Sequence, residues 1–159
     1  MLMNGALPCC EKTIASPVGI LTLESDGVSV TALRFGDHRK GIPSCPVLEQ
    51  AAGELAEYFS GTRREFTVPL SPRGTEFQRL VWGQLCRIPY GATAAYADIA
   101  AKLGNPGACR AVGSANNRNP LPIFIPCHRV IGKNGSLTGY AGGLAVKKAL
   151  LRLEGRIIE

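Results

Sequence analysis

The chain of 159 residues is 45% hydrophobic and carries a net charge of +6, which allows a buried core in one domain or two small ones and excludes a disordered chain. The charge is unevenly divided, since residues 1–73 carry 7 Lys and Arg against 8 Asp and Glu, while residues 74–159 carry 11 against 4. No apolar run approaches a membrane span, and the first ten residues lack the regions of a secretory signal, so we expect no membrane partner and a cytoplasmic location.

The first half, residues 1–73, is predicted to form a small α/β domain. Two β-prone runs, 19–23 and 28–33, flank a Ser-Asp-Gly turn and predict a hairpin, with 66–68 as a candidate third strand. Apolar residues at helical spacing predict a helix over 47–59. A proline-rich stretch at 69–73 is typical of a linker. This half contains no convincing catalytic cluster, so we interpret it as structural.

The second half, residues 74–159, is predicted to form short helices with tight connections. Start and stop signals place helices at 75–85, 93–103, 107–116 and 144–153. The second and third of these are joined by a glycine-containing turn, which is a helix-turn-helix pattern. Residues 130–131 and 136–138, joined by a turn with two glycines, predict a hairpin wing.

The basic charge of the second half is the electrostatic footprint of a polyanion partner, most simply nucleic acid; a solvated basic face without a partner is the alternative. The helix expected over 107–116 consists almost entirely of small residues, with Arg110 as its only long charged side chain. A major-groove reader normally carries several long polar side chains. Small residues plus one Arg better suit a minor-groove approach with one side chain inserted into the base stack. Tight helix packing with Arg110 in solvent explains this helix equally well.

Cys127 stands beside His128, one of only two histidines, in the run Ile125-Pro126-Cys127-His128-Arg129-Val130. A thiolate is a strong nucleophile, and an imidazole is the usual means of making one at neutral pH. In a regular strand the two side chains would point to opposite faces and could not touch. Activation therefore requires a turn here or a bridging water, and Pro126 makes the backbone less regular. A chance pair in a buried core strand is the alternative.

Six cysteines are present: Cys9, Cys10, Cys45, Cys86, Cys109 and Cys127. Their spacing forms no compact framework, so we expect reduced thiols. A zinc site would need a Cys-x-x-Cys motif or closely paired Cys and His, and apart from Cys127-His128 the chain has neither. Cys9, Cys10, His38 and Cys45 could converge only through the fold, and we therefore expect no metal.

Several ordered motifs resemble those of the O6-alkylguanine-DNA alkyltransferases, also called methylated-DNA-protein-cysteine methyltransferases. They are Arg110-Ala111-Val112-Gly113, Asn119-Pro120, the run 125–130, and Thr138-Gly139-Tyr140-Ala141-Gly142-Gly143-Leu144. The likeness covers the second half and extends weakly into the first through Ser16-Pro17-Val18-Gly19. It implies an α/β protein with a ribonuclease H-like first domain and a winged-helix second domain.

The resemblance further implies direct DNA repair. The protein would bind double-stranded DNA as a monomer, flip an O6-alkylguanine out of the duplex and transfer the alkyl group to Cys127, once and irreversibly, with no cofactor. Activity on O4-methylthymine and cooperative assembly on DNA stay open. A lesion-binding relative or a winged-helix regulator is the rival interpretation, but such binders lack the reactive cysteine. A Cys-His hydrolase would need water to regenerate the enzyme, and a thioether has no leaving group for that.

The resemblance also assigns roles by motif position. Cys127 would be the nucleophile, His128 would deprotonate it through a water, and Glu154 would orient His128. Glu154 stands out from the sequence as well, because a carboxylate in the last turn of a helix opposes the helix dipole, and such a violation of a local rule is expected at functional residues. Tyr96 would donate a proton to guanine N3 as the C–O bond breaks.

Arg110 would fill the gap left by the flipped base, and Asn119 would link the helix-turn-helix to the active-site segment. The DNA-binding residues implied in this way are Ala108, Arg110, Ala111, Gly113, Ala115, Asn116 and Asn119. The guanine pocket would be lined by Pro122, Val130, Tyr140, Ala141, Gly142 and Gly143. Ala141 would offer its backbone N–H to O6, since its side chain has no polar group.

Overall fold

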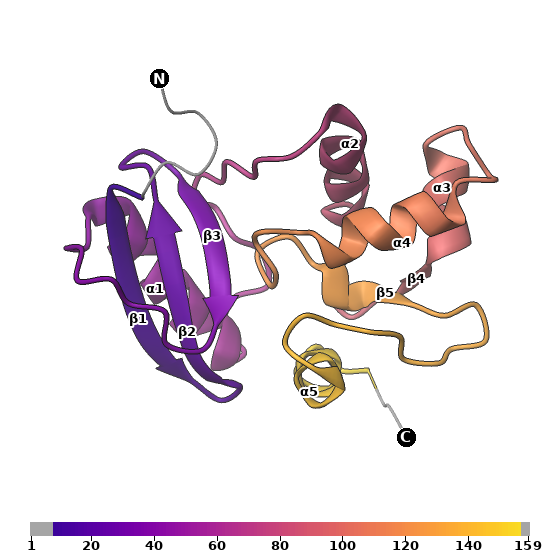
Figure 1. The fold of residues 1–159 in the computed structure, drawn as a ribbon. Helices are drawn as coiled ribbons and strands as arrows, with labels where there is room; N and C mark the ends of the chain where they lie inside the picture. The colour runs from indigo at the N-terminus through magenta and orange to yellow at the C-terminus, as the bar shows by residue number, and fades with distance from the viewer. Residues whose placement is uncertain (1–7, 157–159) are drawn as a thin grey trace. The chain divides into compact units, whose positions relative to one another are not determined.

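The computed structural model describes residues 8–156 of the chain (Figure 1). Residues 1–7, which belong to the segment expected to lack a secretory signal, and residues 157–159 lie outside the described part. The chain divides into two compact units, of which the first ends at Pro72 and the second begins at Arg73. No helix within residues 8–156 is long and apolar enough to cross a membrane.

The first unit is an antiparallel sheet with one helix against it. β1 (Cys10–Ser16), β2 (Gly19–Ser25) and β3 (Val30–Phe35) lie side by side in chain order. Figure 1 shows α1 (Pro46–Phe59) along one face of this sheet. The core between them is formed by fully buried leucines, namely Leu21, Leu23, Leu48 and Leu55. The predicted hairpin and the predicted helix are thus confirmed.

The prediction of a strand at 66–68 is wrong, because these described residues form no strand and β1 is the third member of the sheet. The buried carboxylate of Glu54 accepts hydrogen bonds from the backbone N–H of Thr67 at 2.8 Å and of Val68 at 3.2 Å. These N–H groups are therefore not available to a neighbouring strand. β1 was missed because Ile14 is its only large apolar residue, which leaves no alternating pattern.

The second unit is built from α2 (Glu76–Leu85), α3 (Tyr96–Lys102), α4 (Cys109–Asn117) and α5 (Leu144–Leu153). α2 begins with a capping box, in which Thr75 Oγ1 accepts from the Gln78 N–H at 3.1 Å and Gln78 Oε1 accepts from the Thr75 N–H at 2.9 Å. α3 and α4 form the predicted helix-turn-helix, and Gly104 (φ +76°) supplies the left-handed turn residue between them.

A two-residue parallel ladder joins two distant parts of this unit. β4 (Ala94–Ala95) pairs with β5 (Val130–Ile131). The second helix therefore begins at Tyr96 instead of residue 93, because the two alanines before it are extended. The ladder fixes the start of α3 to the chain directly after Cys127–Arg129.

The predicted hairpin wing is not formed, since the described residues 136–138 belong to no strand. A tight turn closes instead, with the Gly132 N–H donating to the Ser136 carbonyl at 2.8 Å. Beyond it the chain turns Thr138 toward side chains of α3 and α5. The strand that the wing would have paired with, β5, takes β4 as its partner.

Candidate active site

Cys127 begins a single turn of 3₁₀-helix, Cys127–Arg129, and not a strand. The Arg129 N–H donates to the Pro126 carbonyl at 3.0 Å, which closes the turn. Shortly before it, Ile123 has a φ of +75°, a left-handed conformation that β-branched residues rarely adopt. The backbone therefore changes direction here, and the opposite-face constraint of a regular strand does not apply to Cys127 and His128.

His128 and Glu154 form a buried pair. His128 Nε2 lies 2.8 Å from Glu154 Oε2, and both side chains are fully inaccessible to solvent. An ionised carboxylate only accepts hydrogen bonds, so Nε2 carries the proton and Nδ1 is the acceptor nitrogen of the ring. Nδ1 is buried and makes no hydrogen bond within residues 8–156. The ring therefore presents one basic nitrogen that can receive a proton.

Arg129 holds the same carboxylate from its other side. Its Nε donates to Glu154 Oε1 at 2.7 Å and its Nη2 donates to Oε2 at 2.9 Å. Its Nη1 donates to the Ile88 carbonyl at 2.7 Å, and its guanidinium lies 5.8 Å from the centre of the Tyr90 ring. No role for Arg129 was predicted, because nothing in the sequence places it beside a residue at the far end of α5.

The Cys127 thiol is buried, and burial raises its pKa to about 11. The side chains of Asn119 and Tyr140 and the charge of Lys147 act in the opposite direction, since each stabilises the thiolate. The thiol is therefore protonated at neutral pH and needs a base. Burial also lowers the pKa of His128 below its usual value, against the opposing effect of Glu154, so the imidazole is neutral and able to act as that base.

Lys147 is a residue of this site that sequence reasoning missed. It is fully buried on α5, its Nζ donates to the Thr138 carbonyl at 3.3 Å, and its charge favours the Cys127 thiolate. Burial lowers the pKa of Lys147. One signal was present in the sequence, because Lys147 stands three and four residues before the buried Leu150 and Leu151 and so lies on the apolar face of its helix.

Asn119 joins α4 to the active-site segment. Its Nδ2 donates to the Ile125 carbonyl at 2.8 Å, and its Oδ1 accepts from the Leu121 N–H at 2.9 Å. Because Asn119 follows the C-terminus of α4 and Ile125 precedes Cys127 by two residues, the two bonds fix the loop between the helix and the cysteine. The residues expected to line a pocket differ in exposure: Pro122 and Val130 are buried, Tyr140 and Gly142 are half-buried, and Ala141 and Gly143 are exposed.

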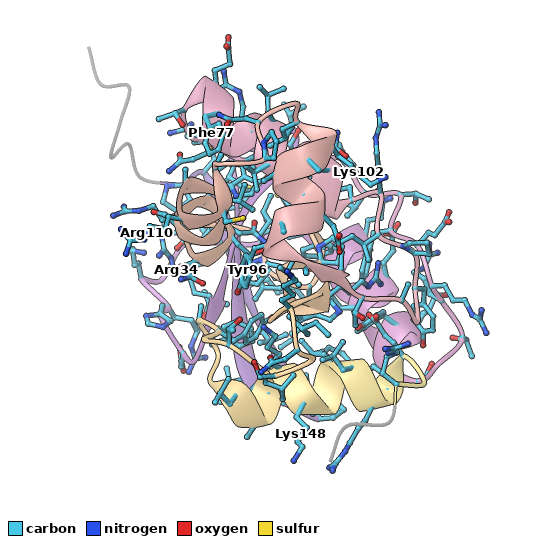
Figure 2. The ribbon with its side chains drawn as sticks, turned by 90° about the vertical axis from the view of Figure 1, so that its right-hand side faces the viewer. Arg34, Phe77, Tyr96, Lys102, Arg110 and Lys148 are labelled. Atoms are coloured by element: carbon cyan, nitrogen blue, oxygen red, sulfur yellow. The ribbon has the colours of Figure 1, made fainter. Side chains whose placement is uncertain are left out.

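Tyr96 is half-buried at the first position of α3, and its hydroxyl forms a hydrogen bond with Thr138 Oγ1. Its ring packs against α4 at Gly113, where an added Cβ would lie 3.8 Å from two ring atoms. Figure 2 shows Tyr96 near α4, with Arg110 extending outward from that helix. The expected proton donor therefore touches the helix expected to bind DNA.

The predicted DNA-binding residues of α4 fall on two faces. Arg110 and Ala111 are exposed, and Ala108 and Gly113 are half-buried. The side chains of Ala115 and Asn116, which are also predicted to bind DNA, are only 2% and 3% exposed. Their face of α4 packs on α2, where Trp82 Nε1 donates to the Ala115 carbonyl at 2.8 Å. This helix is therefore tightly packed on one side and exposes Arg110 on the other, and its approach to the minor groove stays a prediction.

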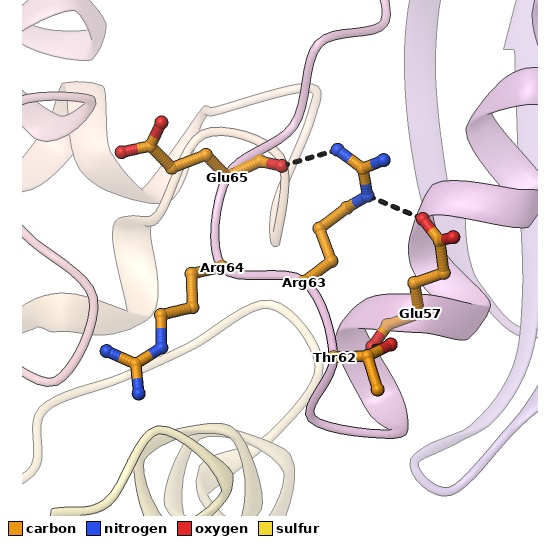
Figure 3. Close-up of a pocket in the computed structure, with 5 residues that line it drawn as sticks. All are labelled: Glu57, Thr62, Arg63, Arg64 and Glu65. Carbon is orange, nitrogen blue, oxygen red and sulfur yellow. Dashed lines mark hydrogen bonds and ion pairs between the residues drawn. The ribbon is translucent and has the colours of Figure 1, made fainter.

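The first unit holds none of these groups. Its polar pocket is shown in Figure 3, where Arg63 Nε donates to Glu57 Oε1 at 2.7 Å and Arg63 Nη1 donates to the Glu65 carbonyl at 2.9 Å. All six cysteines are free thiols. Within residues 8–156 no three His, Cys, Asp or Glu side chains come together in a group that could hold a metal ion.

A basic helix-turn-helix unit with a buried Cys-His-Glu site defines a DNA-associated protein with cysteine chemistry, and comparison with known proteins agrees. Residues 10–72 match the family described as 6-O-methylguanine DNA methyltransferase, ribonuclease-like domain, and residues 76–156 match the DNA binding domain of the same description. The chain belongs to the 6-O-methylguanine DNA methyltransferase family.

Individual relatives are similar over most of their length. A methylated-DNA–protein-cysteine methyltransferase of Methanosarcina acetivorans is 48% identical over 147 residues, which cover 88% of this chain and 94% of the relative. The crystal structure of Mycobacterium tuberculosis O6-methylguanine methyltransferase has a TM-score of 0.84 at 47% identity and covers 91% of this chain and 92% of its own. The structure of M. tuberculosis OGT in complex with DNA has the same TM-score of 0.84 at 49% identity and covers 91% of each chain.

Proposed function

We propose that this protein repairs DNA directly, by taking the alkyl group of an O6-alkylguanine in duplex DNA onto the sulfur of Cys127. The product is a thioether, which water does not cleave under ordinary conditions. Each molecule therefore reacts once, as a methyltransferase without turnover. Residues 74–159 would bind the DNA and accept the group, and residues 1–73 would form a separate structural domain.

The observation that carries this proposal is the arrangement around Cys127. Burial raises the pKa of the Cys127 thiol to about 11, and the next residue in the sequence is the neutral His128. The carboxylate of Glu154 orients this histidine, with Oε2 lying 2.8 Å from Nε2. Such a site makes a thiolate only when a proton is moved to His128, which keeps the sulfur unreactive until a substrate is in place. The family membership supplies the substrate class.

The chemistry follows from the groups in place. His128 Nδ1 takes the Cys127 proton through a bridging water, and Glu154 stabilises the imidazolium that forms. The sulfur then attacks the alkyl carbon, the bond from that carbon to O6 breaks, and Tyr96 gives a proton to guanine N3. A neutral guanine is a far better leaving group than its anion.

Binding to DNA would use the exposed face of α4. Its small residues allow the helix to approach the minor groove closely, and the exposed Arg110 would occupy the space of the flipped base. Asn119 would keep the cysteine segment in register with this helix. The second unit also holds the basic charge of the chain, with 11 Lys and Arg against 4 Asp and Glu in residues 74–159. A reducing compartment such as the cytoplasm would keep the thiol available.

The test is intact mass after mixing the protein with duplex DNA that bears O6-methylguanine. One methyl adduct on the Cys127 peptide is expected, and none with the Cys127→Ser variant. An unmodified protein that still binds the lesion would instead support the rival function, a binder that recognises alkylated guanine without accepting the group.

A further inference from the structure

Thr138 connects two groups of the site that come from different helices. Its Oγ1 is hydrogen-bonded to the hydroxyl of Tyr96 at the start of α3. The same Oγ1 accepts from Lys147 Nζ on α5 at 3.4 Å, and the Thr138 carbonyl accepts from that Nζ at 3.3 Å. The three side chains thus form a chain of hydrogen bonds from the buried ammonium of Lys147 to the phenol of Tyr96, which is expected to protonate the flipped guanine. Nothing in the sequence motifs or in the family description assigns a role to Thr138.

The chemistry of the three groups allows the hydrogen bonds of this chain to run from Lys147 through Thr138 to Tyr96. An ammonium has only donors, so the hydroxyl oxygen of Thr138 accepts from Lys147. The single proton of that hydroxyl is then free to point at the oxygen of Tyr96. The phenol proton is in turn left to donate to a third partner. When the Tyr96 oxygen accepts the Thr138 proton, its own proton points away from Thr138.

We propose that Thr138 is a positioning residue for the transfer reaction, which aims the hydroxyl proton of Tyr96 at N3 of the flipped guanine. This role rests on the proposed function. It also stabilises the negative charge that develops on the phenol oxygen, because the Thr138 hydroxyl, polarised by Lys147, already donates to that oxygen. A donor in place before the reaction needs no reorganisation when the charge appears.

The step balances. The Cys127 sulfur forms a bond to the alkyl carbon while the bond from that carbon to O6 breaks, and the bonding pair passes into the purine. Tyr96 gives its proton to N3, so the guanine leaves neutral. The phenolate takes the hydroxyl proton of Thr138, and Thr138 takes a proton from Lys147, which ends as a neutral amine. His128 keeps the proton that came from the thiol.

The test compares Thr138→Val, which keeps the shape and loses the hydroxyl, with Thr138→Ser, which keeps the hydroxyl. Both retain the backbone carbonyl that Lys147 also binds. With free O6-benzylguanine as substrate, Thr138→Val is expected to slow benzyl transfer to Cys127 by about tenfold or more, which is part of the rate enhancement that general acid catalysis usually gives. Thr138→Ser is expected to restore most of the rate. Thr93→Val makes the same exchange at a half-buried threonine of the same unit and is expected to match the unchanged protein.

Two further substrates separate positioning of Tyr96 from a structural effect. Iodoacetamide alkylates the Cys127 thiol without a purine leaving group, and O6-benzyl-3-deazaguanine has no N3 to protonate. Thr138→Val is expected to react with both at the rate of the unchanged protein. An equal loss on all three substrates, or no loss on O6-benzylguanine, would overturn the role of Thr138. If the unchanged protein reacts with iodoacetamide at Cys127 but takes no methyl group from O6-methylguanine in duplex DNA, the proposed function itself fails.

Discussion

Arg129 and Glu154 form a two-bonded ion pair inside the second unit, with N···O distances of 2.7 and 2.9 Å. The side chains are 8% and 0% exposed. The pair keeps the carboxylate charged and leaves its Oε2 in place to accept the proton of His128 Nε2 as well. The Glu154 carboxylate therefore binds both Arg129 and His128, the base of the site. Its orientation is fixed by Arg129 as well as by the histidine.

Breaking this pair is expected to be costly. Arg129→Met leaves a buried carboxylate without its cation, which typically lowers the free energy of unfolding by about 3–5 kcal/mol. The control is Arg39→Met, which removes one exposed pair partner, since Arg39 and Asp37 are 63% and 37% exposed. That change is expected to cost less than about 1 kcal/mol. Urea unfolding of the two variants measures both values, and equal losses would contradict the special weight given to Arg129.

The rate of alkyl transfer is expected to depend on pH through His128. Its pKa is lowered from the usual 6.5 by burial, so the ring is neutral and can accept the Cys127 proton at neutral pH. Protonation of the ring at lower pH removes the base, so the rate of alkyl transfer falls as the pH drops below about 6.5. The midpoint of this fall is expected at a pH below that value. Benzyl transfer from O6-benzylguanine over about pH 5 to 8 measures this profile. His128→Gln should be slower by about 10² or more and should lose the acidic limb. A midpoint above the usual value would contradict a buried neutral base.

Lys147 is expected to set the reactivity of the thiol. Lys147→Met removes a buried positive charge that favours the thiolate, so the pKa of Cys127 should rise further and its alkylation by iodoacetamide should slow by about tenfold for each pKa unit. The matched control is the neighbouring Lys148→Met, because Lys148 is half-buried and lies about 100° farther round α5 than Lys147. Mass spectrometry of the Cys127 peptide against time measures the rates, and identical rates in the two variants would remove Lys147 from the site.

Arg110 is expected to act only on DNA substrates. Arg110→Ala should slow repair of O6-methylguanine in a duplex by about tenfold or more, because the gap left by the flipped base is no longer filled and base flipping costs a few kcal/mol. The same variant should react with free O6-benzylguanine at an unchanged rate, since no base has to leave a stack. Single-turnover assays with both substrates make the comparison. Equal losses on both would show that Arg110 supports the fold of α4 instead.

The helices were largely predictable because their signals are local. The final helix over 144–153 was predicted with its observed bounds, since Gly143 and Gly155 flank a regular apolar period. The start of α3 was not, because Ala94 and Ala95 are good helix formers that become extended only by pairing with β5. The predictions of the wing and of the strand at 66–68 were wrong for the same reason. Distant strands or side chains bind the backbone groups that local strand pairing would have used.

The candidate site was predictable as a set of residue types but not as an arrangement. The pair Cys127-His128 and the badly placed carboxylate of Glu154 both carry local signals. The ion pair between Arg129 and Glu154 carries no local signal, because the two residues are 25 positions apart in the sequence. They come together only when α5 packs against the Cys127 turn. The burial of Ala115 and Asn116 was not predicted, because motif position does not say which face of a nine-residue helix is buried.

Burial of the Cys127 thiol has a consequence for the lifetime of the protein before it meets damage. A reagent that is used once is wasted by any stray electrophile or oxidant, and reactivity toward these follows the thiolate fraction and exposure of a cysteine. With 4% exposure and a pKa raised to about 11, the resting sulfur is protected on both counts. The number of lesions that a cell can repair equals its number of unreacted molecules, so the low resting reactivity of this thiol preserves that capacity.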